Sequence, residues 1–137
     1  MTRPATQIAL IAWALGLNAQ PSSAERNLIP GLERTYNTCP ERPPEPDWMQ
    51  NIALRDAYQR VLVQDIYRAQ NLELIVEAGT CPCDVRFPDW GKAETTFRDK
   101  YTAATRWEML DASKTYNRRA NELRLEAMTI CEAAGNW

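Results

Sequence analysis

Two long stretches of the chain, residues 48–78 and 92–134, contain neither Pro nor Gly, and this constrains the fold more than any other feature. Pro removes a backbone donor and Gly loosens the backbone, so their absence over such lengths favours long helices. The apolar residues of the first stretch keep roughly helical spacing. They are Tyr58, Leu62, Ile66, Ala69 and Val76, preceded by Ile52 and Leu54. We predict one helix over residues 47–78, with Asp47 as its N-cap and Gly79 as its left-handed C-terminal residue.

The second stretch predicts a helix over residues 89–134, which begins at Asp89 and is capped by Gly135, with Trp137 folding back on its last turn. Its apolar residues form two stripes that are out of phase by one to two residues. The first stripe is Phe97, Tyr101 and Ala104, and the second is Tyr116, Ala120, Leu123, Ala127 and Ile130. The phase changes near residues 107–113. Either the helix is continuous and changes its packing partner there, or it breaks near residues 111–113. We favour a continuous or gently kinked helix, because the stretch holds no breaker residue.

The connection between the two stretches, residues 79–91, holds two Gly, two Pro and two Cys, which is typical of a loop. We therefore predict an all-α fold over residues 48–137. It is built on a long antiparallel helical hairpin, or on a three-helix bundle if the second helix breaks. Residues 25–47 form an arm before it, and residues 39–46 of that arm include four Pro. Such a segment is extended, close to polyproline II. We favour a stiff spacer over a Pro-rich docking ligand for another protein.

The first 24 residues have the order of a secretory signal peptide. Arg3 is the only charged residue before Glu25, and an apolar run covers residues 8–17. Small residues at the −3 and −1 positions, Ser22 and Ala24, place the expected cleavage directly before Glu25. This apolar run is too short to cross a membrane, which takes about 20 residues, and no later segment resembles a span. We expect a periplasmic or extracellular protein.

The chain has four cysteines, Cys39, Cys81, Cys83 and Cys131, and an exported chain is free to form disulfides. In an antiparallel hairpin, the arm meets the end of the second helix, so Cys39–Cys131 is a natural pair. Cys81 and Cys83 then remain, and a disulfide between residues two apart is possible but tight. In a three-helix bundle, Cys131 instead returns towards the connection and pairs with Cys81 or Cys83. The pairing therefore tests the fold.

The sequence Cys81-Pro82-Cys83 is best interpreted as a pinned loop, and the functional alternatives are a redox switch, a metal site or a handle for another chain. The spacing is one residue short of the thioredoxin-like C-x-x-C, and it also lacks the usual spacing of zinc ligands. The chain has no His, which excludes Ser-His-Asp and Cys-His catalytic systems as well as His-liganded zinc and haem. We predict no catalytic residue, no metal site and no cofactor. A thiol–disulfide protein using Cys81 and Cys83 is the alternative.

Four tryptophans follow the predicted signal peptide, and they are Trp48, Trp90, Trp107 and Trp137. A two-helix hairpin cannot bury all four, so each is a candidate for contact with a protein partner. Trp107 comes first because it lies at the phase change of the second helix. Packing within the chain remains the alternative for each.

The charged side chains indicate solvated helix faces. Glu73/Glu77 and Glu122/Glu126 are carboxylate pairs four residues apart, which suits a helix surface better than the cleft of a glycosidase. Arg118, Arg119 and Arg124 lie among these acidic residues, and the formal net charge is −2. We expect no nucleic-acid partner.

Two motifs resemble small exported proteins that are encoded with conjugation and type IV secretion components in proteobacteria. The first is Cys81-x-Cys83-x-x-Arg86-Phe87-Pro88-x-Trp90-x-x-Ala93-Glu94, and the second is Ile130-Cys131-Glu132-x-x-Gly135-Asn136-Trp137. The resemblance implies a periplasmic or pilus-associated accessory protein and supplies no catalytic residues. Together with the slender fold, it predicts a non-enzymatic structural or interaction subunit that works with cell-envelope proteins or with a second copy of itself. A secreted binding or inhibitor module is a further alternative.

Overall fold

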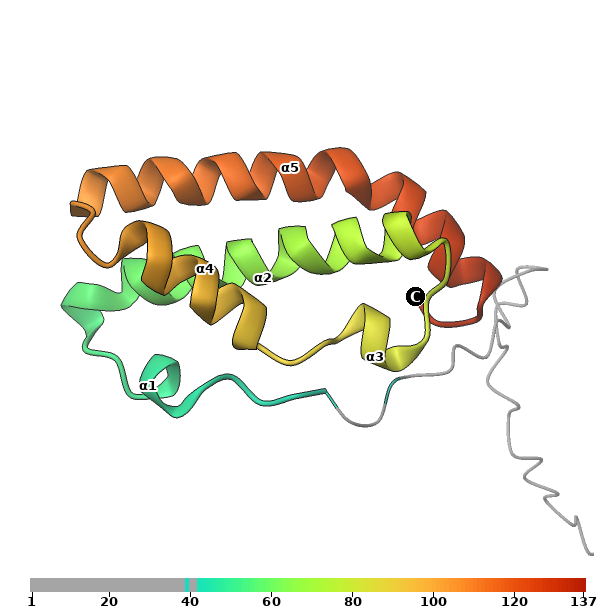
Figure 1. Cartoon of the computed structure of the whole chain (residues 1–137), viewed down its shortest axis with the longest axis horizontal. Helices are drawn as coiled ribbons and strands as arrows, with labels where there is room; N and C mark the ends of the chain where they lie inside the picture. Colours follow the sequence, from blue (N-terminus) through green and yellow to red (C-terminus); the bar gives the residue numbers. More distant parts are fainter. Residues whose placement is uncertain (1–38, 40–41) are drawn as a thin grey trace, which may run out of the picture. The chain divides into compact units, whose positions relative to one another are not determined.

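The computed structural model describes residue 39 and residues 42–137, and every element in that part of the chain is helical. The elements are α1 (Asp47–Gln50), the 3₁₀ turn η1 (Leu54–Asp56), α2 (Ala57–Ala78), α3 (Cys83–Arg86), α4 (Gly91–Tyr101) and α5 (Arg106–Ala133) (Figure 1). The predicted all-α fold is confirmed. The predicted signal peptide, residues 1–24, and most of the predicted arm lie outside the described residues.

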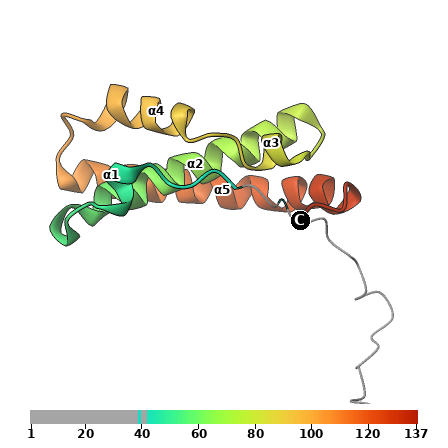
Figure 2. The ribbon, with the colours of Figure 1, turned by 90° about the horizontal axis from the view of Figure 1, so that it is seen from below.

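The central helix is α2, against which both α4 and α5 pack. The chain runs back along α2 in α4 and turns again into α5, so that α2 and α5 point in the same direction (Figure 1). Hydrogen bonds advance together along these two helices: Asn117 donates to Asp65, and Arg68 donates to Asn121. In the turned view, α2 and α5 cross one another in projection, and α4 lies to one side of both (Figure 2). Of the two arrangements predicted, the described helices form the three-helix one.

The second Pro- and Gly-free stretch breaks at residues 102–105. We favoured a continuous helix and placed a possible break near residues 111–113, and both expectations are wrong. A new helix starts because Thr105 and Glu108 form a capping box. The Thr105 hydroxyl accepts from the Glu108 N–H at 3.4 Å, and the Glu108 carboxylate accepts from the Thr105 N–H at 2.6 Å. This T-x-x-E signal is readable in the sequence. The two stripes are out of phase because they belong to different helices.

The first stretch also breaks, at residues 51–53, where we predicted one helix over residues 47–78. The short helix α1 ends at Asn51, whose side-chain amide donates to the Asp47 carbonyl at 2.8 Å. After η1 the chain enters α2 in a different direction. The prediction of a helix start at Asp47 is therefore right, but the helix that begins there is only four residues long.

Burial of Met49 and ring stacking of Trp48 account for that break. Met49 is fully buried against the first turns of α2, and Trp48 stacks on Phe97 of α4 with ring centroids 5.8 Å apart. A continuous helix would carry Met49 about 12 Å beyond the start of α2, away from this core. Burying a side chain of that size stabilises the fold by roughly 1.5–3 kcal/mol, which outweighs the helix propensity of the few residues that leave the helix.

The predicted glycine caps at the C-terminal ends of the long helices are confirmed, but the N-cap residues are Pro46 and Trp90, and not Asp47 and Asp89 as predicted. Gly79 follows α2 with a φ of 64°, and Gly135 follows α5 with a φ of 71°, both in the left-handed region that favours Gly. At the start of α4, the Asp89 carboxylate accepts from the Gly91 N–H at 2.7 Å. Local sequence chemistry therefore fixes three of the helix ends.

The core consists of two apolar clusters along α2. The cluster at the start of α2 contains Met49, Leu62, Val63, Ile66, Ala93, Phe97 and Met109. The cluster at the end of α2 contains Ala69, Leu72, Ile75, Cys81, Ala120, Leu123, Ala127 and Cys131. The first cluster joins α2 to α1, α4 and α5, whereas the second joins α2 to α5 and to the two cysteines.

The described part of the arm, residues 42–46, is extended and packs against the helices; we call it the strap. The Trp90 indole donates to the Pro43 carbonyl at 3.2 Å. The Glu45 carboxylate accepts from the Arg60 guanidinium of α2, with an N–O distance of 2.7 Å. These five residues form neither helix nor strand, and their contacts hold them along the helices, where we predicted a spacer.

Candidate functional site

All four cysteines are paired, as Cys39–Cys83 and Cys81–Cys131. The pair Cys39–Cys131, which we expected for a two-helix hairpin, is therefore wrong, and Cys81 is not bonded to Cys83. The alternative expected for a three-helix bundle, in which Cys131 returns to the connection, is confirmed. The physical reason is the direction of α5: because it runs parallel to α2, both helices end beside residues 81–83.

Burial separates the two disulfides chemically. Cys81 and Cys131 are 2% and 0% exposed, whereas Cys83 is an exposed residue. Asn136 lies between the two bonds and is itself buried; its side-chain amide donates to the Cys81 carbonyl at 2.7 Å. Thiol exchange requires access of an attacking thiolate to a sulfur atom. The Cys81–Cys131 bond is shielded from such attack, and the loop is pinned as predicted.

The structure gives three of the four candidate tryptophans a role within the chain. Trp48 donates from its indole to Glu94 at 2.8 Å, in addition to its stacking on α4. Trp90 stacks on Tyr67 with ring centroids 3.8 Å apart. Trp137 folds back and packs against the cluster at the end of α2. These three residues hold the strap, α4 and the C-terminus in place.

Trp107 differs from the other three, because 77% of it is exposed. It lies in the first turn of α5, two residues after the capping box residue Thr105 and one residue before Glu108. The neighbouring Arg106 places its guanidinium over the Tyr58 ring of α2, 5.4 Å from the centroid. The start of α5 is therefore fixed on both sides of Trp107, while the indole itself projects into solvent.

Other exposed apolar residues lie at the same end of the helices. Leu54 in η1 is 93% exposed and Val61 in the second turn of α2 is 45% exposed. Leu110 is partly exposed and lies one turn after Trp107, so these two side chains share a face of α5. We call the group Leu54, Val61, Trp107 and Leu110 the apolar end.

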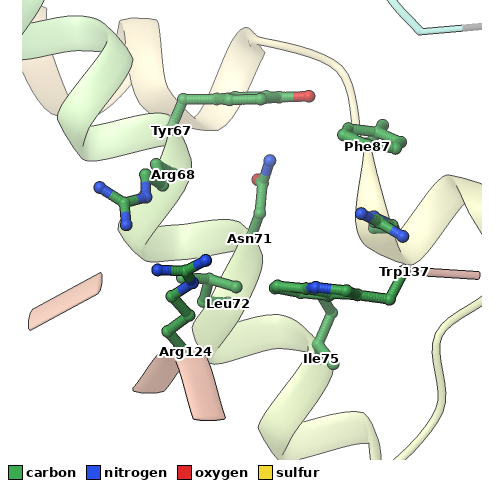
Figure 3. A pocket seen from close by; sticks show the side chains of 9 residues that line it. Tyr67, Arg68, Asn71, Leu72, Ile75, Phe87, Arg124 and Trp137 are labelled. Carbon is green, nitrogen blue, oxygen red and sulfur yellow. The ribbon is translucent and has the colours of Figure 1, made fainter. Parts of the chain in front are cut away.

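A groove lies at the opposite, disulfide-linked end, with a cavity volume of about 500 Å³ (Figure 3). It is lined by Tyr67, Arg68, Asn71, Leu72, Ile75, Arg86, Phe87, Arg124 and Trp137. Arg68 and Arg124 lie on one side and Phe87 on the other, with Asn71 between Tyr67 and Trp137 (Figure 3). We call it the arginine groove. No single stretch of sequence indicates it, because its walls come from four separate segments.

The basic cluster noted in the sequence, Arg118, Arg119 and Arg124, does not act as one group in the structure. Arg119 pairs with Glu73 across α2 and α5 at 3.0 Å, and it approaches Glu122 at 3.8 Å. Arg124 points instead into the groove (Figure 3). Glu77 and Glu126 are exposed, as expected for solvated helix faces. Partial burial and the nearby Arg42 guanidinium together lower the pKa of Arg86 below its ordinary value.

Within residues 39 and 42–137 we find no group of His, Cys, Asp and Glu suited to a metal ion, and no helix there has the length and apolar character needed to span a membrane. Comparison with protein-family models, with curated proteins and with solved structures found no match to this chain.

Proposed function

We propose that this protein is a non-enzymatic interaction subunit of the bacterial cell envelope, exported to the periplasm, of the kind that accompanies a type IV secretion or conjugation machine. The observation that carries the proposal is Trp107, a large aromatic side chain that is 77% exposed on a rigid helix start. Trp is among the residues that contribute most to protein–protein binding energy. We infer that the apolar end contacts a protein partner, either an envelope protein or a second copy of this chain.

The rigidity of this surface supports its use in binding. The capping box and the stacking of Arg106 on Tyr58 fix the backbone on each side of Trp107. Binding then costs little ordering of the backbone, and the indole brings large contact area with only two rotatable bonds. Apolar side chains that gather on one part of a surface mark interaction sites more often than single scattered ones do.

Two further features support the cellular context. Disulfides persist mainly in oxidising compartments such as the bacterial periplasm, and this chain has two. The motifs around Cys81 and Cys131 resemble exported proteins encoded with conjugation components. Both features agree with the signal peptide expected over residues 1–24.

The test is a photo-crosslinking amino acid at position 107, in the full chain expressed with an intact secretion system, compared with the same amino acid at Leu125. Leu125 is also strongly exposed, at 70%, but lies near the other end of α5. We expect a defined crosslinked partner from position 107 only. Trp107→Ala should weaken binding to that partner, or self-association measured by sedimentation, by about 30-fold, which corresponds to a hot spot of about 2 kcal/mol. A monomer that gives no crosslink from position 107 would refute the proposal.

Thiol–disulfide exchange is the second candidate, and the exposure of Cys83 favours it. A nucleophile could attack the Cys39–Cys83 bond while the buried Cys81–Cys131 bond keeps the helices joined. An insulin-reduction assay decides between the two functions. Turnover that is abolished by Cys83→Ala would favour the redox protein over the interaction subunit.

A further inference from the structure

The arginine groove collects positive charge without an acidic partner. Arg68, Arg86 and Arg124 all line it, and no Asp or Glu does. Arg68 donates only to the neutral side chain of Asn121, at 2.8 Å. Throughout the part of the chain that the structure describes, none of the three guanidinium groups forms an ion pair. Elsewhere on the same helices arginines do find carboxylates, as Arg119 does with Glu73.

Aromatic faces hold one of these guanidinium groups in place. Arg86 stacks over the Phe87 ring at 5.1 Å and over the Trp137 ring at 4.9 Å. Arg42 of the strap approaches the same Phe87 ring at 4.2 Å. Two positive groups therefore share one aromatic ring, and Arg86 cannot turn away without losing both stacking contacts. A bound anion would relieve the repulsion between them.

The floor of the groove is apolar. Leu72 and Ile75 of α2 are buried beneath it, and Trp137 forms one wall (Figure 3). A cavity of about 500 Å³ is within the range of sites that enclose a ligand. The groove thus offers an apolar contact and a ring of guanidinium groups side by side. Guanidinium forks match the planar geometry of carboxylates and can bind them through two parallel hydrogen bonds.

We propose that the arginine groove binds an acidic peptide segment of a partner protein. Its carboxylates lie between Arg68, Arg86 and Arg124, and a neighbouring apolar side chain lies against Trp137. Charge complementarity selects this occupant, because three unpaired guanidinium groups face one small cavity. The apolar floor favours a peptide over a phosphate backbone, and the overall formal charge of −2 opposes general attraction to nucleic acid or an anionic membrane.

This proposal goes beyond the one made for Trp107. The groove lies at the disulfide-linked end, and Trp107 lies at the other end of α5. Binding of an acidic peptide here requires no contact at the apolar end. The two proposals can therefore fail separately.

The experiment is fluorescence anisotropy with the full chain in its disulfide-bonded form and a labelled peptide that alternates Glu with Leu and Phe. A peptide with Gln in place of every Glu is the ligand control. We expect the acidic peptide alone to bind, with affinity that falls as salt rises. Arg124→Gln should weaken binding at least tenfold, whereas Arg118→Gln, an exposed arginine of the same helix outside the groove, should not. Trp107→Ala should leave peptide binding unchanged.

Arg124 is exposed and belongs to neither core cluster, so we expect its variant to fold, which circular dichroism verifies. Three results would overturn the proposal. The first is no binding of the acidic peptide at millimolar concentration. The second is an equal effect of Arg124→Gln and Arg118→Gln. The third is Arg124-dependent binding to vesicles of anionic phospholipid in the absence of peptide binding.

Discussion

Removal of the buried Cys81–Cys131 disulfide tests whether this covalent link holds α5 in register with α2. The two residues are 50 apart in sequence. In the loop-entropy model, a closed loop of this size stabilises the folded chain by about 4 kcal/mol. Both cysteines belong to the core, and replacing each by Ala leaves a void that costs roughly 1 kcal/mol. We expect Cys81→Ala/Cys131→Ala to lose roughly 5–6 kcal/mol, as much as the whole stability of many small domains.

The matched comparison is Cys39→Ala/Cys83→Ala. Its bond joins residues 44 apart, so the loop-entropy contribution is again about 4 kcal/mol. Cys39 is buried, at 8% exposed, but Cys83 is exposed, and its replacement by Ala leaves no void in the core. We therefore expect this variant to be less destabilised than the first by roughly 1 kcal/mol, which is the contribution of one void.

The assay is urea unfolding at 25 °C followed by circular dichroism. With a slope of about 1–2 kcal/mol per molar urea, a loss of 4 kcal/mol lowers the midpoint by roughly 2–4 M. If Cys81→Ala/Cys131→Ala does not fold at all while Cys39→Ala/Cys83→Ala does, the order of stability that we expect is still established. An equal or larger loss from Cys39→Ala/Cys83→Ala would refute the reasoning from burial.

Double cysteine variants also establish the disulfide pairing, which proteolysis alone cannot do. Cys81 and Cys83 are separated only by Pro82, so both remain on one peptide. In Cys81→Ala/Cys131→Ala, the remaining cysteines should form one disulfide and leave no free thiol. In Cys83→Ala/Cys131→Ala, the remaining Cys39 and Cys81 are not a native pair, and two thiols should react with a thiol reagent. Free thiols in the first variant, or none in the second, would contradict the pairing seen in the structure.

Two further predictions concern polar contacts. Asn136→Ala removes the donor to the buried Cys81 carbonyl, and we expect the free energy of unfolding in urea to fall by about 1–3 kcal/mol. The control is Asn121→Ala at an exposed position, for which we expect a loss of less than about 0.5 kcal/mol. The backbone N–H and the hydroxyl of Thr105 donate to the Glu108 carboxylate and lower the pKa of that carboxyl from the ordinary 4.5. The stability that the Glu108 carboxylate contributes is therefore complete above pH 4.5, and it is lost as the pH falls through the lowered pKa. The acid-induced loss of stability should be smaller in Glu108→Gln, and an unchanged acid profile would contradict this.

The sequence predicted the helical content and the ends of the helices where local chemistry decides them. Gly79 and Gly135 cap helices as expected, and the Asp89 carboxylate accepts from the Gly91 N–H beside the start of α4, because each residue acts through its own backbone or its nearest neighbours. The break before α5 also depends on neighbouring residues, because Thr105 and Glu108 have the spacing of a capping box. Our prediction missed this break because it gave more weight to the absence of Pro and Gly than to the capping box.

The break at residues 51–53 could not be predicted from local sequence in this way. No residue there opposes a helix strongly, and the chain turns because Met49 becomes buried against α2 and Trp48 stacks on Phe97 of α4. Such a decision depends on the position of partners far along the chain. The break at residues 102–105 sets the direction of α5, and this direction brings Cys131 to Cys81, so that missed break led to the wrong partner for Cys39.

The arginine groove shows why a site assembled from several segments escapes sequence reasoning. Arg68, Arg86 and Arg124 come from three helices, and Trp137 reaches the groove only because Gly135 turns the chain back after α5. In the sequence, Arg124 was grouped with Arg118 and Arg119 among acidic residues, where charges appear balanced. The structure separates Arg124 from the other two, because residues five and six apart on a helix face different directions. Trp107, in contrast, was a usable candidate, since a large side chain near a phase change has no obvious place in either stripe.

The two proposed surfaces should act independently, and the covalent links give the reason. Coupling between distant sites requires an element with two alternative arrangements whose balance both ligands shift. The disulfides fix the end of α5 and the loop at residues 81–83, while the capping box fixes the start of α5. The groove walls are thus held in one arrangement whether or not the apolar end is occupied. A peptide affinity that changes when Trp107 binds its partner, and returns to its free value after Trp107→Ala, would show that α5 transmits a change that these links should prevent.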